Sequence, residues 1–298
     1  MREDRLAATL CGIALRNPVL AASGTFGYGI EFAPLLDLNA LGGIVTKGLS
    51  REAIAGNPPP RLWHTEGGMI NSVGLQNLGV EAFIAKKLPL LRRYSVPVFV
   101  NVFGYAAEDY VEVVRALEAA EGIAGYELNV SCPNTKHGGM FFSSDPALLS
   151  DLVARVRQVA RRPLIVKLSP NVAKIEPFAK AAEEFGADAI SLINTLVSLA
   201  LDPRTGQPRL GGVSGGLSGP AVKPLAVRLV SEAVAAVKIP VIGVGGIFTG
   251  EDAAEFLAAG ASAVEVGTAT FVDPRAPLRI AAGLERFLER QRTAESAK

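Results

Sequence analysis

Cysteine and histidine are scarce in this 298-residue chain, which contains only Cys11, Cys132, His64 and His137. Two distant cysteines do not make a disulfide framework, and their small number fits a reducing compartment. So few thiols and imidazoles also argue against a structural zinc ion or an iron–sulfur cluster. We therefore expect no metal centre and a cytoplasmic location.

The chain also lacks an excess of charge and a long apolar segment. Its 30 basic and 29 acidic residues give a formal net charge of +1, so no general field draws it toward nucleic acid or an anionic membrane. The N-terminal segment contains acidic residues, and the apolar runs are strand-sized and broken by glycine, proline or charge. We expect neither a signal peptide nor a membrane span.

Short apolar runs recur along the chain, and helix-like stretches follow them. Parallel strands that are buried on both faces have this composition, and eight strand–helix units predict an α/β fold of the TIM (β/α)8-barrel type. We expect one domain over residues 1–298. The predicted strands are residues 18–22, 43–47, 97–102, 125–130, 164–168, 189–194, 240–244 and 263–267.

Helical patterns lie between these strands, and several have recognisable starts. Asp145 precedes Pro146 as an N-cap, and Thr249 opens a segment with acidic residues in its first turn. The predicted helices are residues 80–93, 108–121, 146–161, 175–185, 221–237, 251–259 and 278–290.

Three further segments complete the predicted architecture. Residues 6–15 predict a small N-terminal hairpin under the barrel. Two long connections rich in glycine and proline, residues 48–80 and 196–220, predict long loops at the C-terminal rim. Loops of this length in a compact domain are usually functional, so we expect them to act as lids.

Polar or glycine residues end every predicted strand, and in a barrel these ends form the catalytic rim. A single polar strand end has the alternative explanation of a simple cap, but eight together favour a site. The residues are Ser23, Lys47, Gly48, Asn101, Asn129, Lys167, Asn194, Thr195, Gly245, Gly246, Gly267 and Thr268.

The pairs Gly245-Gly246 and Gly267-Thr268, which follow the last two strands, predict a phosphate site, because glycine lets backbone N–H groups approach an anion. Tight turns are the alternative. The segment from Gly243 to Phe248 is not a dinucleotide fingerprint, since Phe248 stands where the third glycine is required.

Two lysines and one cysteine are candidates for chemistry at the rim. Lys47 and Lys167 would direct a charge into the cavity and stabilise a developing anion, unless they only reach out to solvent. Cys132 lies on a polar loop, where a thiol can serve as base or nucleophile. The alternative is an inert buried thiol, the role that we expect for Cys11.

Five short motifs together resemble dihydroorotate dehydrogenase over nearly the whole chain. They are TKG from Thr46, NSVGLQN from Asn71, NVSCPN from Asn129, KLS from Lys167 and GVGGI from Gly243. The soluble members use a cysteine base, which the resemblance assigns to Cys132. The run from Gly67 to Asn77 is similar to the NAD-linked type B catalytic subunit, whereas residues 140–145 depart from the family pattern.

The resemblance implies one FMN per chain and a substrate site beside it. Lys47 would face the substrate carboxylate, and asparagine amides would match the amide edges of dihydroorotate. The implied FMN contacts are Ser23, Lys47, Gly48, Asn101, Asn129, Lys167, Ile193, Gly219, Gly245, Gly246, Gly267 and Thr268. The implied substrate contacts are Lys47, Asn71, Ser72, Val73, Gly74, Leu75, Asn129, Asn134, Asn194 and Thr195.

The resemblance also implies oxidation of dihydroorotate to orotate in pyrimidine biosynthesis, with the proton taken by Cys132 and the hydride by FMN. Electrons would reach NAD+ through a partner subunit that carries FAD and a [2Fe–2S] cluster, in a heterotetramer of two plus two chains. One alternative is the fumarate-linked homodimer of the family. Others are another FMN barrel acting on pyrimidines and, outside redox chemistry, a phosphate-binding aldolase or isomerase.

Overall fold

Eight parallel strands close into a barrel in the computed structural model, which describes residues 6–131 and 142–296. Each strand pairs with its neighbours in the order β3-β4-β7-β8-β9-β10-β13-β14, and β14 returns to β3. All eight predicted strands are present, which confirms the predicted fold. They are β3 (Val19–Ala21), β4 (Gly43–Val45), β7 (Val98–Val102), β8 (Gly125–Asn129), β9 (Leu164–Lys167), β10 (Ala189–Leu192), β13 (Val241–Val244) and β14 (Ala263–Val266).

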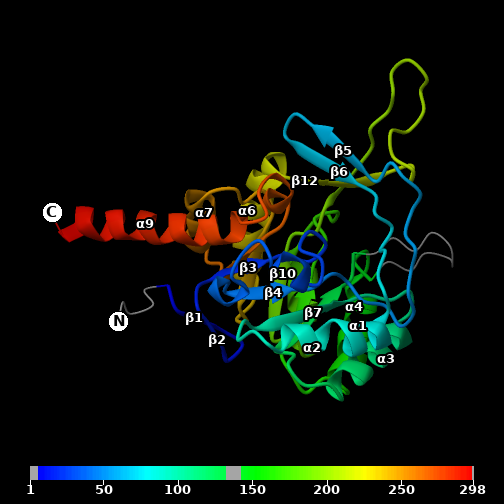
Figure 1. Cartoon of the computed structure of the whole chain (residues 1–298), viewed down its shortest axis with the longest axis horizontal. Helices are drawn as coiled ribbons and strands as arrows, with labels where there is room; N and C mark the ends of the chain where they lie inside the picture. The colour runs from blue at the N-terminus through cyan, green and yellow to red at the C-terminus, as the bar shows by residue number, and fades with distance from the viewer. Residues whose placement is uncertain (1–5, 132–141, 297–298) are drawn as a thin grey trace.

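Helices cover the outside of the barrel (Figure 1). The two predicted starts are confirmed, since Asp145 accepts from the N–H of Ala147 and Thr249 accepts from that of Asp252. The helices are α1 (Val80–Lys86), α2 (Leu88–Leu91), α3 (Ala107–Glu118), α4 (Pro146–Arg157), α5 (Glu176–Glu184), α6 (Lys223–Ala236), α7 (Gly250–Ala258), α8 (Ala269–Val272) and α9 (Ala276–Ser296), with short 3-10 turns at Ile30–Phe32, Leu38–Ala40 and Pro220–Val222. Within the described residues, no helix is long and apolar enough to cross a membrane.

The helix predicted over residues 80–93 is divided into α1 and α2, which is a correction. Pro89 lies in the first turn of α2. Proline has no N–H to donate to the carbonyl four residues earlier, so a helix does not continue through it easily. Proline is well tolerated in the first turn of a new helix. The short helix α8 was not predicted, because four residues do not establish a periodicity.

The predicted N-terminal hairpin is confirmed as β1 (Ala8–Leu10) and β2 (Ile13–Leu15). Its turn residues Cys11 and Gly12 both have positive φ, the combination that suits a two-residue hairpin loop. Leu10 and Leu15 belong to one apolar cluster with inward residues of the barrel strands, such as Phe99 and Ile165. The hairpin therefore closes the end of the barrel at which the strands begin.

The two long connections, predicted as loops at the rim, also contribute a four-stranded antiparallel sheet, which the sequence analysis did not predict. Its order is β11-β12-β6-β5, with β5 (Leu62–Thr65), β6 (Gly68–Asn71), β11 (Leu196–Ser198) and β12 (Gly215–Ser218). Figure 1 shows β5, β6 and β12 on the opposite side of the barrel from β1 and β2. This sheet joins segments that are about 150 residues apart in sequence, as in the pairing of Asn71 with Gly216.

Candidate active site

The predicted rim residues lie at the carboxyl ends of the barrel strands. Asn129 and Lys167 are the last residues of β8 and β9, while Lys47 and Asn194 each follow their strand by two residues. Because the strands are parallel and closed, these four positions share one end of the barrel. The prediction that they lie on one rim is confirmed.

Asn129 and Asn194 are in direct contact. The amide Nδ2 of Asn194 donates to Oδ1 of Asn129 over 3.0 Å, and the same oxygen accepts from the N–H of Ser131. Oδ1 of Asn194 accepts from the N–H of Thr195 over 2.8 Å. Both side chains are only partly buried, so the rim presents a hydrogen-bonded pair of amides to its opening.

Asn71 and Thr195 are brought together through Gly216, which the sequence analysis did not single out. Nδ2 of Asn71 donates to the carbonyl of Gly216 over 3.2 Å. A Cβ on Gly216 would lie 2.0 Å from Oγ1 of Thr195, so only glycine fits there. The sheet thus carries Asn71 to the side of the rim where Thr195 stands.

The remaining members of the predicted substrate loop make their contacts away from the two rim asparagines. The hydroxyl of Ser72 accepts from the amide of Asn57, and the carbonyl of Val73 accepts from the N–H of Asn57. Gly74 and Leu75 have positive φ. The structure therefore places residues 72–75 in a turn against Asn57.

Lys167 lies deeper than the sequence analysis suggested, inside the barrel and 4% exposed. Its Nζ lies 3.0 Å from Oε2 of Glu265 and 3.5 Å from Oε1 of Glu127. It also donates to Oγ of Ser23 over 3.3 Å, which links it to the rim. The sequence analysis missed both glutamates, although a charged residue inside an otherwise apolar strand is a visible signal in each case.

A second set of contacts fixes Asn101 and Glu127. Nδ2 of Asn101 donates to Oε1 of Glu127 over 2.6 Å, and Ser191 donates to Oε2 over 2.8 Å. Gly48 lies against this pair, because a Cβ on it would stand 2.7 Å from Oδ1 of Asn101. Neighbours in the barrel interior therefore hold Asn101 in place. It was predicted to lie at the rim, but the structure places its side chain deeper, inside the barrel.

Lys47 lies at the rim and is partly buried. Burial lowers the pKa of its ammonium group, and the positive charge of Arg61 lowers this pKa further. Both effects disfavour an isolated cation and therefore favour an anionic partner. A carboxylate ligand beside Lys47 would offset the free-energy cost of burying this ammonium group.

Glycines on neighbouring loops form a cradle at the other side of the rim. Gly219, Gly245 and Gly246 have positive φ, and a Cβ on Gly246 would lie 2.9 Å from the carbonyl oxygen of Gly219. The side chain of Ile193 lies against Gly245, with Cγ1 3.2 Å from the position of a Cβ there. These four residues, which come from three segments, are therefore brought together as predicted.

Gly267 and Thr268 stand next to this cradle. A Cβ on Gly267 would be in ordinary van der Waals contact with its surroundings, with its nearest neighbour, Cβ of Ala22, at 3.6 Å. Thr268 donates to the hydroxyl of Ser218 over 2.8 Å, which ties the four-stranded sheet to β14. Among the described residues, no hydrogen-bond acceptor is found for the backbone N–H groups of Gly246, Gly267 and Thr268. Such N–H groups suit a phosphate.

The donors of the rim fit an FMN. The glycine cradle suits its phosphate, and two buried oxygens without a partner among the described residues, Oγ of Ser131 and Oε1 of Glu265, mark polar sites that a ligand or a proton would satisfy. The buried cation of Lys167 suits the negative charge of a reduced flavin.

Two predicted residues, Cys132 and Asn134, lie outside the described residues, as do Met140 and Phe141 of the segment that departs from the family pattern. The other cysteine, Cys11, donates to the carbonyl of Asp188 at the opposite end of the barrel. Burial and then the charge of Asp188 raise the pKa of its thiol to about 11. Cys11 is therefore an inert thiol, as predicted from its apolar surroundings.

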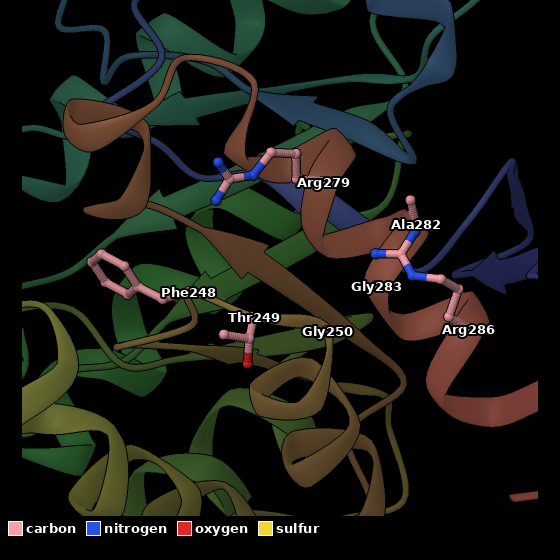
Figure 2. A pocket seen from close by; sticks show the side chains of 7 residues that line it. All are labelled: Phe248, Thr249, Gly250, Arg279, Ala282, Gly283 and Arg286. Atoms are coloured by element: carbon pink, nitrogen blue, oxygen red, sulfur yellow. The ribbon is translucent and has the colours of Figure 1, made fainter. Parts of the chain in front are cut away.

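Two surface hollows are lined by residues outside the predicted rim set. One, of about 310 Å³, lies between α7 and α9, and Figure 2 shows Phe248, Thr249 and the arginines Arg279 and Arg286 around it. The other, of about 430 Å³, is lined by residues 91–98 and 121–124. Neither includes an amide, glycine or lysine of the rim set. The convergence of hydrogen-bonding groups therefore favours the rim as the site.

Comparison with known proteins agrees with the motifs. Residues 5–288 match the family model described as dihydroorotate dehydrogenase. A protein of Solibacter usitatus called putative dihydroorotate dehydrogenase A (fumarate) is 69% identical over 96% of this chain and 94% of its own length. The dihydroorotate dehydrogenase B (NAD(+)) catalytic subunit of Geobacter sulfurreducens is 54% identical over 97% and 94%, and that of Geotalea uraniireducens 52% over 99% and 97%.

Proposed function

This chain belongs to the dihydroorotate dehydrogenase family, a family of FMN-dependent oxidoreductases, and we propose that it oxidises dihydroorotate to orotate at the barrel rim in pyrimidine biosynthesis. The observation that carries the proposal is the amide pair of Asn129 and Asn194, with Lys47 on the same rim. Dihydroorotate has amide edges and one carboxylate. Asparagine both donates and accepts, and a lysine attracts a carboxylate, so this donor set matches the substrate.

The cofactor would lie across the rim between the glycine cradle and Lys167. Gly219, Gly245, Gly246, Gly267 and Thr268 would hold its phosphate with backbone N–H groups. Ser23, Lys47, Gly48, Asn101, Asn129, Lys167 and Ile193 would complete its surroundings. When it is bound, FMN supplies the redox chemistry by accepting a hydride, for which side chains have no equivalent.

The protein's own part in the reaction is to orient the substrate and to remove a proton. Asn71, Asn194 and Thr195 would hold the ring, with Ser72, Val73, Gly74, Leu75 and Asn134 as further contacts that the family resemblance implies. Cys132 would be the general base. It lies three residues beyond Asn129, and a thiol whose ordinary pKa is about 8.5 is a usable base near neutral pH.

The electron acceptor in our proposal is NAD+, reached through a second subunit. The relatives of Geobacter sulfurreducens and Geotalea uraniireducens are named NAD(+)-linked catalytic subunits. This sequence has no dinucleotide fingerprint of its own. We propose a partner that carries FAD and a [2Fe–2S] cluster, in a heterotetramer of two plus two chains in the cytoplasm.

The second candidate acceptor is fumarate, because the 69% identical relative of Solibacter usitatus is named for it. In that case the chain would work as a homodimer without an electron-transfer subunit. The two acceptors make opposite predictions for the isolated chain, so one assay separates them.

Steady-state turnover of the purified, FMN-loaded chain tests the acceptor. We expect slow turnover with artificial dyes, none with NAD+, and restoration of NAD+ reduction when a co-purifying flavin and iron–sulfur protein is added. Rapid turnover with fumarate by the chain alone would assign it to the fumarate-linked type. Rapid turnover with NAD+ by the chain alone would remove the need for a partner.

A further inference from the structure

The barrel interior below the rim holds a cluster of three ionisable residues, Glu127 of β8, Lys167 of β9 and Glu265 of β14. Their side chains are 0%, 5% and 0% exposed, and Nζ of Lys167 lies between the two carboxyl groups. If all three were charged, the cluster would carry a net charge of −1. A buried charge without a partner is costly, so one carboxyl group has reason to keep its proton.

The two carboxyl groups differ in their hydrogen-bond partners. Oε1 of Glu127 accepts from Asn101 and Oε2 accepts from Ser191, so both oxygens of this group are satisfied. Glu265 has Lys167 at Oε2, whereas its Oε1 has no partner among the described residues. Donors to both oxygens stabilise an ionised carboxylate, and Glu127 is therefore the ionised member. The proton belongs on Glu265.

The pKa directions agree with this assignment. Burial raises the pKa of Glu265, and the charge of Glu127 adds to this rise, which together bring it to about 8 despite Lys167. Burial also opposes ionisation of Glu127, but Lys167 and the hydrogen bonds to this group outweigh it and lower its pKa. Burial disfavours the ammonium of Lys167, yet the two glutamates keep its pKa raised.

The barrel strands leave few other groups to influence Glu265. The other polar side chains that contact the cluster are Asn101 and Ser191, which donate to Glu127, and Ser23, which accepts from Lys167, and none of them titrates in this range. Strands β3 and β13 contain no titratable residue, and β4 is followed by Lys47 at the rim. The apolar cluster that the hairpin closes lies on the other side. Charge changes therefore reach Glu265 from the rim.

We propose that Glu265 is a positioning residue that couples the flavin to solvent protons: at alkaline pH, where it is ionised while the flavin is oxidised, it takes up one proton when the flavin is reduced. This inference rests on the proposed FMN site. The hydride from dihydroorotate carries both electrons, and the proton that Glu265 takes up comes from solvent, so Glu265 itself is neither oxidised nor reduced. Negative charge that arrives at the rim makes ionisation of a nearby carboxyl group less favourable, and Lys167 links that charge to Glu265.

The test is an anaerobic redox titration of the FMN-loaded protein over a pH series from about 6 to about 10. This series includes pH values below and above the raised pKa of Glu265. It compares the wild type with Glu265→Gln, which keeps the shape but cannot titrate. The control is Glu232→Gln, in a partly exposed residue of α6 that pairs with Arg228. Above the pKa of Glu265, we expect the wild type and the control to take up as much as one proton more per two electrons than Glu265→Gln. Near pH 6, all three proteins should take up the same number.

Equal proton uptake by the wild type and Glu265→Gln at every pH would overturn the inference while leaving the proposed function intact. A wild-type chain that binds no FMN would instead overturn the proposed function. If Glu265→Gln fails to fold, infrared difference spectra of the wild type decide the matter. A protonated-carboxyl band that grows on reduction at alkaline pH supports the inference, and its absence contradicts it.

Discussion

The side-chain amide of Asn194 donates to Oδ1 of Asn129 over 3.0 Å, and the surrounding backbone fixes this orientation. The N–H of Ser131 donates to Oδ1 of Asn129, and the N–H of Thr195 donates to Oδ1 of Asn194. A backbone N–H can only donate, so the oxygen of each amide is assigned by its partner. Among the residues that the structure describes, the NH2 group of Asn129 has no acceptor, and it can donate to a ligand at the rim.

The first prediction concerns this pair. Asn194→Asp replaces the donor with a carboxylate oxygen that faces Oδ1 of Asn129, so the contact becomes repulsive. Loss of such a polar contact costs about 1–3 kcal/mol, and we expect the KM for dihydroorotate to rise about 5- to 150-fold while FMN content stays unchanged. Asn39→Asp is the control, because Oδ1 of Asn39 only accepts, from Ser95. A wild-type KM in Asn194→Asp would contradict the proposed substrate contact.

The second prediction concerns Gly216, which lies between Asn71 and Thr195. In Gly216→Ala the new Cβ meets Thr195 at 2.0 Å from Oγ1 and 2.5 Å from Cβ, so β12 or the rim must shift. We expect weaker binding of orotate by about tenfold or more, a cost of at least about 1.4 kcal/mol, with FMN retained. Ser214→Ala, on an exposed residue next to β12, should bind orotate as the wild type does. Unchanged orotate affinity in Gly216→Ala would separate this sheet from the substrate site.

The third prediction tests the base. Cys132→Ala should keep its FMN but reduce it with dihydroorotate about 10²- to 10⁴-fold more slowly, because proton removal fails. Cys132→Ser should retain more activity and favour higher pH, since a hydroxyl ionises less readily than a thiol. Cys11→Ala removes the other thiol, which has a pKa of about 11 at the far end of the barrel, and should leave the rate unchanged. Stopped-flow absorbance measures all three, and a wild-type rate in Cys132→Ala would exclude this base.

The fourth prediction concerns stability. Burial opposes ionisation of Glu118, but the N–H groups of Arg161 and Arg162, the hydroxyl of Tyr126 and the Arg162 guanidinium together hold its pKa below the ordinary value. A lowered carboxyl pKa gives stability that is present above the unfolded pKa and is lost as pH falls through the folded one. Glu118→Gln should therefore lower the free energy of unfolding by about 1–2 kcal/mol at neutral pH.

Urea unfolding at neutral pH and in acid checks this sign. The difference in the free energy of unfolding between the wild type and Glu118→Gln should become smaller as pH falls below the ordinary glutamate pKa of about 4.3. Glu121→Gln, whose side chain is 79% exposed beside Arg92, should cost little at either pH. A difference that grows in acid would reverse the assigned direction.

The barrel and most of its rim could be predicted from the sequence because the signals are local. Each buried strand is a short apolar run, and its polar end lies next to it in sequence, as with Asn129 and Lys167. Parallel topology then brings these ends together without further information. The pairs Gly245-Gly246 and Gly267-Thr268 could be predicted for the same reason.

What the sequence did not reveal depends on distant partners. Strands β6 and β12 contain glycine and small polar residues, and they become strands through pairing between Asn71 and Gly216, far apart in the chain. The glutamates Glu127 and Glu265 stand in apolar runs, and only barrel closure shows that they meet at Lys167. The residue types predicted which side chains supply hydrogen-bond donors at the site. They did not predict how deeply each side chain lies in the barrel.

Anaerobic mixing of the FMN-loaded chain with dihydroorotate tests the proposed function most directly. The account predicts that the yellow absorbance of the flavin bleaches within the time of a single turnover, that one orotate forms per flavin, and that dihydrouracil, which lacks the carboxylate for Lys47, does not bleach it at a comparable rate. A chain that binds no FMN, or a bound flavin that stays oxidised in the presence of dihydroorotate, would contradict it.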